Sequence, residues 1–193
     1  MLLSAVDFSH SLLKETVCKG DLVIDATVGN GSDTVLLATL VGPTGKVIGF
    51  DVQKQAVENT AQKLLLAGLT DQVTLLHQGH ETLADVLADN AKIGGAIFNL
   101  GYLPGSDKTI ITKKNTTIRA IEALLPKLRI GSYILLVVYS GHPGGMEEKK
   151  ALLDYCSSLN QSLFKVLQYG FINQINHPPF LIAIEKKKTP YMK

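Results

Sequence analysis

Short apolar runs alternate along the chain with longer segments in which apolar residues recur every three or four positions. Short apolar runs are typical of buried strands, and the 3.6-residue period is typical of amphipathic helices. The runs predict strands at 22–27, 46–51, 72–77, 94–99, 132–139, 164–171 and 180–185. The periodic segments predict helices at 5–18, 32–40, 53–67, 81–87, 113–127 and 147–158.

The order of these elements predicts the fold class. Strands and helices alternate through the first five strands, which is the pattern of a parallel sheet with helices on both faces. The strand at 132–139 is apolar throughout, so we expect both of its faces to be buried. No helix separates 164–171 from 180–185, and these strands should pair as an antiparallel hairpin. The sequence therefore predicts an α/β, Rossmann-like, seven-stranded, mostly parallel sheet with a C-terminal antiparallel β-hairpin.

Composition narrows the class of protein. The chain has 193 residues, of which 46% are hydrophobic, which fits one domain spanning 1–193. No apolar run approaches the roughly 18 residues of a membrane helix. The N-terminus lacks a basic region and is interrupted by Asp7, which argues against a signal peptide. Cys18 and Cys156 are isolated, so we expect reduced thiols, no metal site and a cytoplasmic location.

Charge is distributed unevenly along the chain. Residues 1–100 carry 6 Lys/Arg and 11 Asp/Glu, a net charge of −5, whereas residues 101–193 carry 13 and 6, a net charge of +7. An acidic half and a basic half suit a protein that holds a small ligand on one side and a polyanion on the other. The alternative interpretation is a solvated surface on which lysines happen to be uneven.

The first predicted strand leads directly into a glycine turn. Asp25 ends the apolar run, Gly29 and Gly31 follow, and the next helix begins at once. Strand, glycine turn and helix form the opening unit of a nucleotide-binding α/β fold. Glycine lets the backbone turn sharply and approach a ligand, and the helix N-terminus offers free N–H groups. Ligands in such sheets bind outside the carboxyl ends of the strands.

Two nucleotides compete for this turn. The dinucleotide fingerprint needs a small third residue, where this chain has Thr34. Asp51 stands 20 residues after Gly31, at the end of the second strand, where it can accept hydrogen bonds from ribose hydroxyls. Asp25 would repel a pyrophosphate, but it suits the amino group and the sulfonium of S-adenosylmethionine. The turn therefore favours S-adenosylmethionine, and an NAD-binding Rossmann protein is the alternative from a different class.

Residues 25–34 closely resemble the cofactor loop of class I S-adenosylmethionine-dependent methyltransferases. After the third strand such folds place a side chain against the adenine, and Gln78 or His80 would supply it here; His80 could equally cap a helix. The cofactor site predicted from the strand-end loops comprises Asp25, Thr27, Gly29, Asn30, Gly31, Asp33, Thr34, Asp51, Val52, Gln53, Gln78, Gly79, His80 and Asn99. His10 of the first helix is a further candidate for facing the cofactor; the alternative, which is commoner for a lone His on an apolar helix, is packing in the core.

The end of the fourth strand suggests the acceptor. Asn99 and Tyr102 keep the spacing of the Asn/Asp-Pro-Pro-Tyr/Phe sequence of amino-methyltransferases, with Leu100-Gly101 in place of the prolines. In those enzymes the Asn carbonyl orients the target amine and the aromatic ring stacks on the base. We therefore predict Asn99 and Tyr102 as catalytic residues; a strand-end cap and an ordinary loop aromatic are the alternatives. The loop contains no Cys, which disfavours covalent methylation at pyrimidine carbon five.

Three motifs together resemble one family of small bacterial proteins: residues 25–34, 98–105 and 141–145. This family was long labelled rRNA methylases and is now associated with methylating the aminomethyl group of 5-aminomethyluridine, or its 2-thio form, at the tRNA wobble position. The resemblance covers nearly the whole chain. It implies S-adenosyl-L-methionine as cofactor, no metal and a tRNA anticodon loop as partner. The implied target pocket is lined by Tyr102, Pro104, Tyr139, His142 and Pro143.

Other functions share this cofactor site. An rRNA methyltransferase or a small-molecule amine methyltransferase would need the same loops, and a catalytically dead RNA-binding adaptor would keep the basic half. A homodimer would help so small a domain to grip a tRNA.

Overall fold

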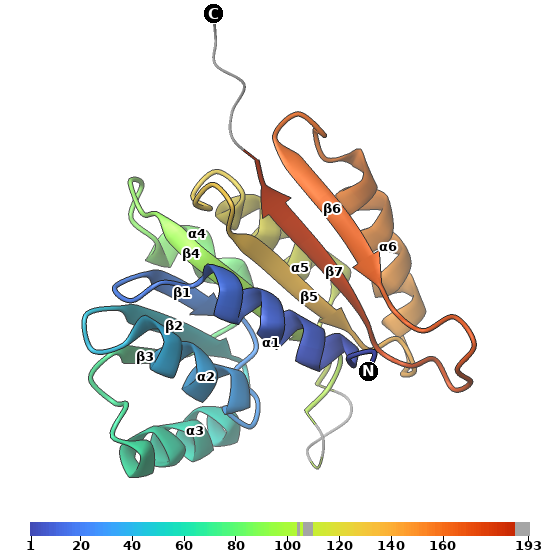
Figure 1. Cartoon of the computed structure of the whole chain (residues 1–193). Coiled ribbons are helices and arrows are strands. Elements are labelled where there is room, and N and C mark those ends of the chain that lie inside the picture. The colour runs from blue at the N-terminus through green and yellow to red at the C-terminus, as the bar shows by residue number, and fades with distance from the viewer. Residues whose placement is uncertain (104, 106–109, 188–193) are drawn as a thin grey trace, which may run out of the picture.

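The computed structural model describes residues 1–103, 105 and 110–187. Seven strands form one sheet in the order β3-β2-β1-β4-β5-β7-β6 (Figure 1). The first five are parallel, and β7 runs antiparallel to both β5 and β6. Their bounds are β1 Leu22–Asp25, β2 Lys46–Asp51, β3 Val73–His77, β4 Ile93–Leu100, β5 Tyr133–Val138, β6 Phe164–Tyr169 and β7 Phe180–Lys186. The predicted fold class and C-terminal hairpin are confirmed.

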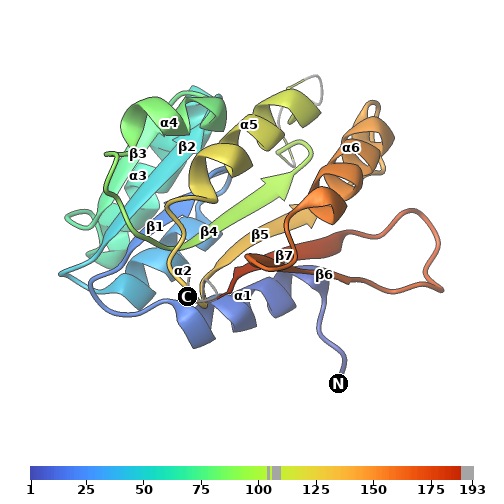
Figure 2. The same cartoon turned by 90° about the horizontal axis from the view of Figure 1, so that it is seen from above.

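Helices cover both faces of the sheet, α1 to α3 on one and α4 to α6 on the other (Figure 2). On the first face lie α1 (Ala5–Thr16), α2 (Ser32–Val41) and α3 (Lys54–Ala67). On the second lie the 3₁₀ turn η1 (His80–Thr82), α4 (Leu83–Val86), α5 (Lys114–Leu124) and α6 (Gly145–Ser158). Among the described residues, no helix is long and apolar enough to cross a membrane.

Local chemistry explains where the predicted bounds moved. The first strand ends at Asp25 rather than at 27, because the Thr27 amide turns back to donate to the Asp25 carboxylate at 3.2 Å. The first helix ends at Thr16 because Val17 adopts extended dihedral angles. The helix predicted at 81–87 is split into a 3₁₀ turn and a single α-helical turn.

Strand parity decides which face each side chain meets. In β5, Ile134 and Leu136 pack into the core under α4 to α6, whereas Leu135 and Val137 pack under α1 to α3. All four are fully buried, which confirms the prediction that this strand is covered on both faces. In β4, Ile97 belongs to the core under α1 to α3. Asn99, two positions further along β4, therefore faces the same helices.

Truncating a central core side chain should destabilise the protein strongly. Leu135 is fully buried, so Leu135→Ala should lower the free energy of unfolding by about 2–5 kcal/mol. Thermal denaturation should show a fall of roughly 2–4 °C for each kcal/mol in a chain of this size. Leu66→Ala is the matched control, since Leu66 is 88% exposed and its loss should change little. Equal melting temperatures for the two variants would contradict this account of the core.

Candidate active site

The turn between β1 and α2 depends on two glycines with positive φ. Gly31 has φ of 81°, and a Cβ there would lie 2.5 Å from Thr60 Oγ1 of α3. Gly29 has φ of 53°, and its Cβ would lie 3.3 Å from the side chain of Leu103, in the loop after β4. The turn is therefore enclosed by α3 on one side and by the loop after β4 on the other. Any larger residue at either position would be strained.

Asp25 lies under the turn rather than at its surface. Its side chain is fully buried and accepts hydrogen bonds from Thr34 Oγ1 at 2.6 Å and from the Thr27 amide at 3.2 Å. Burial, followed by the negative charge of Asp33, raises the pKa of Asp25 to about 7. Thr34, which breaks the dinucleotide fingerprint, thus has a structural partner here. Because Asp25 is buried, a ligand at the surface of the turn would not contact its carboxylate directly.

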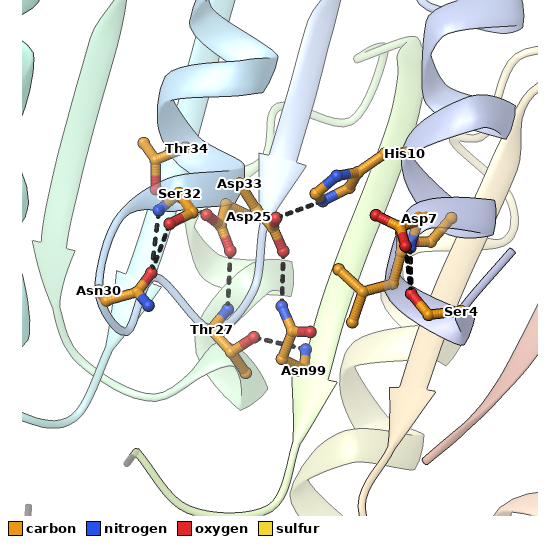
Figure 3. A network of polar contacts seen from close by, with 12 residues as sticks. Ser4, Asp7, His10, Asp25, Thr27, Asn30, Ser32, Asp33, Thr34 and Asn99 are labelled. Atoms are coloured by element: carbon orange, nitrogen blue, oxygen red, sulfur yellow. Dashed lines mark hydrogen bonds and ion pairs between the residues drawn. The ribbon is translucent and has the colours of Figure 1, made fainter. Parts of the chain in front are cut away.

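Asp33 connects three elements at the carboxyl ends of the strands. It lies in the first turn of α2, and its Oδ2 accepts from Asn99 Nδ2 of β4 at 2.6 Å. Its Oδ1 lies 2.7 Å from His10 Nε2 of α1 (Figure 3). The Asn99 amide N–H also donates to Thr27 Oγ1 at 2.7 Å. Asn99 is therefore held by both its side chain and its backbone, next to the glycine turn.

Of the two interpretations of His10, facing the cofactor or packing in the core, core packing does not describe its position. Its ring reaches Asp33 and is only partly buried. A signal was present: His10 follows Val6 by four positions and precedes Leu13 by three, so it lies on the helix face that is turned toward the sheet.

Asp51 connects the glycine turn to the loop after β2. Its Oδ2 accepts from the Gly29 amide and its Oδ1 from the Gln53 amide, both at 2.8 Å. Val52 between them is 55% exposed, which leaves an apolar side chain at the surface beside the turn. Asn30 closes the turn locally, because its Oδ1 accepts from both the amide and the hydroxyl of Ser32. The first two predicted loops therefore form one connected unit.

The two residues after β3 that were candidates for contacting the adenine, Gln78 and His80, differ in burial. His80 is buried, its Nδ1 lies 3.0 Å from the Ala26 carbonyl and its ring packs edge-on against Phe98. A carbonyl only accepts, so Nδ1 carries the proton. Burial lowers the pKa of His80, which favours the neutral ring. Gln78 and Gly79 are only partly buried, so Gln78 is better placed than His80 to meet a ligand from outside.

Three of the predicted target-pocket side chains lie around the end of β4. The rings of Tyr102 and His142 meet edge to face, with centroids 5.9 Å apart. Tyr139 follows β5 and is 39% exposed; burial, followed by the charge of Asp33, raises its pKa. His142 Nδ1 lies 3.0 Å from the Pro143 carbonyl, which leaves a lone pair on Nε2. Pro143 is exposed, and Pro104 lies outside the described residues.

The buried carboxylate of Glu148 holds the chain that returns from the loop after β4. Glu148, in the first turn of α6, accepts from Thr112 Oγ1 at 2.7 Å and from Thr117 Oγ1 at 2.9 Å. The Thr112 amide donates to the Gly101 carbonyl at 3.0 Å, and Ile111 bridges to Tyr102. Glu148 thereby fixes the returning strand of the loop that carries Tyr102. Nothing in the sequence distinguishes Glu148, because a Glu in the first turn of a helix is common for dipole reasons alone.

The residues at the turn fit a cationic nucleotide. Two carboxylates stand close enough for the charge of Asp33 to raise the pKa of Asp25, so a positive group nearby would relieve their repulsion. A pyrophosphate would add to that repulsion. Among the described residues, no group of three or more His, Cys, Asp or Glu could hold a metal ion. The donor set therefore matches S-adenosylmethionine better than NAD.

Comparison with known proteins finds relatives that match most of the chain. A family model described as "Putative rRNA methylase" matches residues 47–185. The tRNA (mnm(5)s(2)U34)-methyltransferase, chloroplastic, of Arabidopsis thaliana is 36% identical over 95% of this chain and 70% of its own length. The structure of a putative rRNA-methylase from Clostridium thermocellum has a TM-score of 0.93 and 41% identity, covering 96% of this chain and 99% of that one.

A second solved structure bears on the cofactor. A putative methyltransferase from Streptococcus mutans, described as a complex with SAH, has a TM-score of 0.88 and 41% identity. The match covers 96% of this chain and 99% of that one. SAH is what S-adenosylmethionine becomes when it has given up its methyl group.

The buried Asp25 carboxylate predicts a distinctive pH dependence of stability. Its pKa is about 7 in the folded state against 3.8 unfolded, so the folded protein binds more protons between these values. The free energy of unfolding should therefore fall as pH rises from about 4 to 7, by up to a few kcal/mol. Asp25→Asn should lack this contribution because an amide does not titrate in this range, and it can still accept from the Thr27 amide and donate to Thr34 Oγ1.

Urea denaturation of the free wild-type protein and of Asp25→Asn, at several pH values, measures this difference. Subtracting the two curves removes groups that titrate alike in both proteins. Parallel stability curves between pH 4 and 8 would show that Asp25 titrates normally.

Proposed function

The chain belongs to the putative rRNA methylase family and is an S-adenosylmethionine-dependent methyltransferase; from this premise we propose that its substrate is tRNA. In the proposed reaction it N-methylates the aminomethyl group of 5-aminomethyluridine, or its 2-thio form, at the wobble position. The family membership removes the case for an NAD-binding protein. The name of the Arabidopsis relative, which specifies mnm(5)s(2)U34, supports the choice of nucleotide.

The observation that carries the proposal is the placement of Asn99. Its amide nitrogen is bound by Asp33, so its side-chain oxygen is turned away from that carboxylate (Figure 3). An amide oxygen accepts hydrogen bonds, so it suits an acceptor that has N–H groups, such as a primary amine. Accepting one N–H would orient the nitrogen lone pair toward the glycine turn, where the cofactor is expected. Positioning of this kind supplies much of the rate of a direct transfer.

When bound, S-adenosylmethionine supplies the methyl group, whose bond to sulfur breaks as the bond to the acceptor nitrogen forms. The amine must present a free lone pair, so it has to be neutral before transfer and loses one proton overall. His142 Nε2 is buried beside the ring of Tyr102, without a hydrogen-bond partner among the described residues, and we propose it as the proton acceptor once the substrate reaches it. Tyr102 and Tyr139 offer exposed rings on which a base can stack.

The surroundings suit an RNA loop. The C-terminal half, with its net charge of +7, supplies the electrostatic attraction for a polyanion. An anticodon loop presents its bases unstacked, so the enzyme needs no separate device to open a helix. An rRNA or a small amine remains the alternative acceptor for the same cofactor site, and a homodimer stays a proposal about how the RNA is gripped.

Transfer of label from S-adenosylmethionine should distinguish these acceptors. We expect incorporation into tRNA from cells that lack this protein, with 5-methylaminomethyluridine as the product found by nucleoside mass spectrometry. Ribosomal RNA from the same cells is the control and should stay unlabelled. Label confined to rRNA, or unchanged 5-aminomethyluridine in tRNA after incubation, would refute the wobble-uridine assignment.

Removing the Asn99 amide should abolish most of the transfer rate. Asn99→Ala deletes the proposed acceptor of the amine N–H, and kcat should fall about 100-fold, in line with the loss of other positioning groups. Asn59→Ala is the matched control, because Asn59 is exposed on α3. Single-turnover kinetics would measure both. An Asn99→Ala enzyme with wild-type kcat would remove Asn99 from the catalytic residues.

A further inference from the structure

We propose that the His10–Asp33 pair is a positioning device for methyl transfer, which locks the Asn99 amide in the one orientation that presents its oxygen to the acceptor. The proposal rests on the amine acceptor proposed above and extends it to two residues that touch Asn99 directly or through one step. Neither residue is argued to react. Their role is to decide which end of the Asn99 side chain faces the substrate.

In the contact between Asp33 and Asn99, the carboxylate determines which end of the amide faces it. An ionised carboxylate can only accept hydrogen bonds, so the group that faces Asp33 Oδ2 at 2.6 Å must be the Asn99 Nδ2 donor. An amide nitrogen and oxygen have nearly the same shape, and without such a partner the side chain could adopt either orientation. A flipped amide would place two acceptor oxygens against each other. Asp33 therefore selects one orientation of Asn99.

The backbone of Asn99 is held as well, and its side-chain oxygen is left to accept. Its backbone N–H is bound to Thr27 Oγ1, so the residue cannot swing away from the β1 turn. Its Oδ1 accepts no hydrogen bond from the part of the chain that the structure describes, and Figure 3 shows this oxygen turned away from Asp33. The side chain thus has one end fixed and one acceptor available. That is the arrangement a target amine requires.

His10 holds the second oxygen of Asp33. Asp33 could rotate about its own side-chain bonds if only one oxygen were held. His10 Nε2 lies 2.7 Å from the other oxygen, and the two side chains are only 23% and 10% exposed. Hydrogen bonds to a carboxylate are stronger than neutral ones, and partial burial protects this one from competing water. Since His10 comes from α1, the first helix is coupled to the end of β4 through a single carboxylate.

The test compares two substitutions of His10. His10→Phe keeps a ring but removes the donor to Asp33, whereas His10→Gln keeps a side-chain N–H that can reach the carboxylate. We expect His10→Phe to lower kcat about tenfold while the KM for tRNA and the affinity for SAH stay within about threefold of wild type. His10→Gln should recover most of the lost kcat. Glu15→Phe, at an exposed position of the same helix, is the control for introducing an aromatic residue into α1.

A second measurement reports on the amide without any substrate. The Asn99 Nδ2 hydrogens, assigned by NMR in the SAH complex, should exchange slowly in wild type and in His10→Gln, and faster in His10→Phe. A His10→Phe enzyme with wild-type kcat and unchanged exchange would overturn the proposal. So would a His10→Gln enzyme as impaired as His10→Phe, or a loss confined to SAH affinity. If wild type leaves 5-aminomethyluridine tRNA unmethylated, the proposed function fails, and the exchange rates alone decide the positioning role.

Discussion

The two carboxylates Asp25 and Asp33 lie close together, at the end of β1 and at the start of α2. Side chains from α1, α2 and β4 contact them. Asp25 is buried and, among the described residues, accepts from one hydroxyl and one backbone amide; its burial first, and then the negative charge of Asp33, raise its pKa to about 7. Asp33 is stabilised by a ring nitrogen and a side-chain amide. Like charges held this close favour a cationic ligand over an anionic one.

The alternation of side chains along the strands explains why these groups meet. Asp25 follows Val23 by two positions in β1, and Asn99 follows Ile97 by two in β4. Val23 and Ile97 both pack under α1 to α3, so Asp25 and Asn99 face the same side of the sheet. The helices on that side then bring Asp33 and His10 to them. Hydrophobic packing thus determines which polar groups can form a network at the end of the sheet.

The loop after β4 connects the two halves of the site. Leu103 lies against the glycine turn, Tyr102 meets His142, and Glu148 holds Thr112 on the returning strand. These contacts at the described ends of the loop hold Tyr102 beside the glycine turn, and in the proposed reaction a small displacement of the acceptor would cost a large share of the rate. The support comes from α6, far along the chain from the turn that it helps to complete.

The sequence by itself determined the elements, the fold class and the glycine turn, because hydrophobic period and glycine position are local properties of the chain. It also located Asp25, Asp51 and Asn99, since the end of a strand can be read from its apolar run. Only the tertiary structure decided that Asp25 is buried beneath the turn and that His10 reaches Asp33. It also decided that His80 is buried, with its ring against Phe98 and its Nδ1 at the Ala26 carbonyl. The contacts of His80 and His10 join residues 54 and 23 positions apart, which no local pattern records.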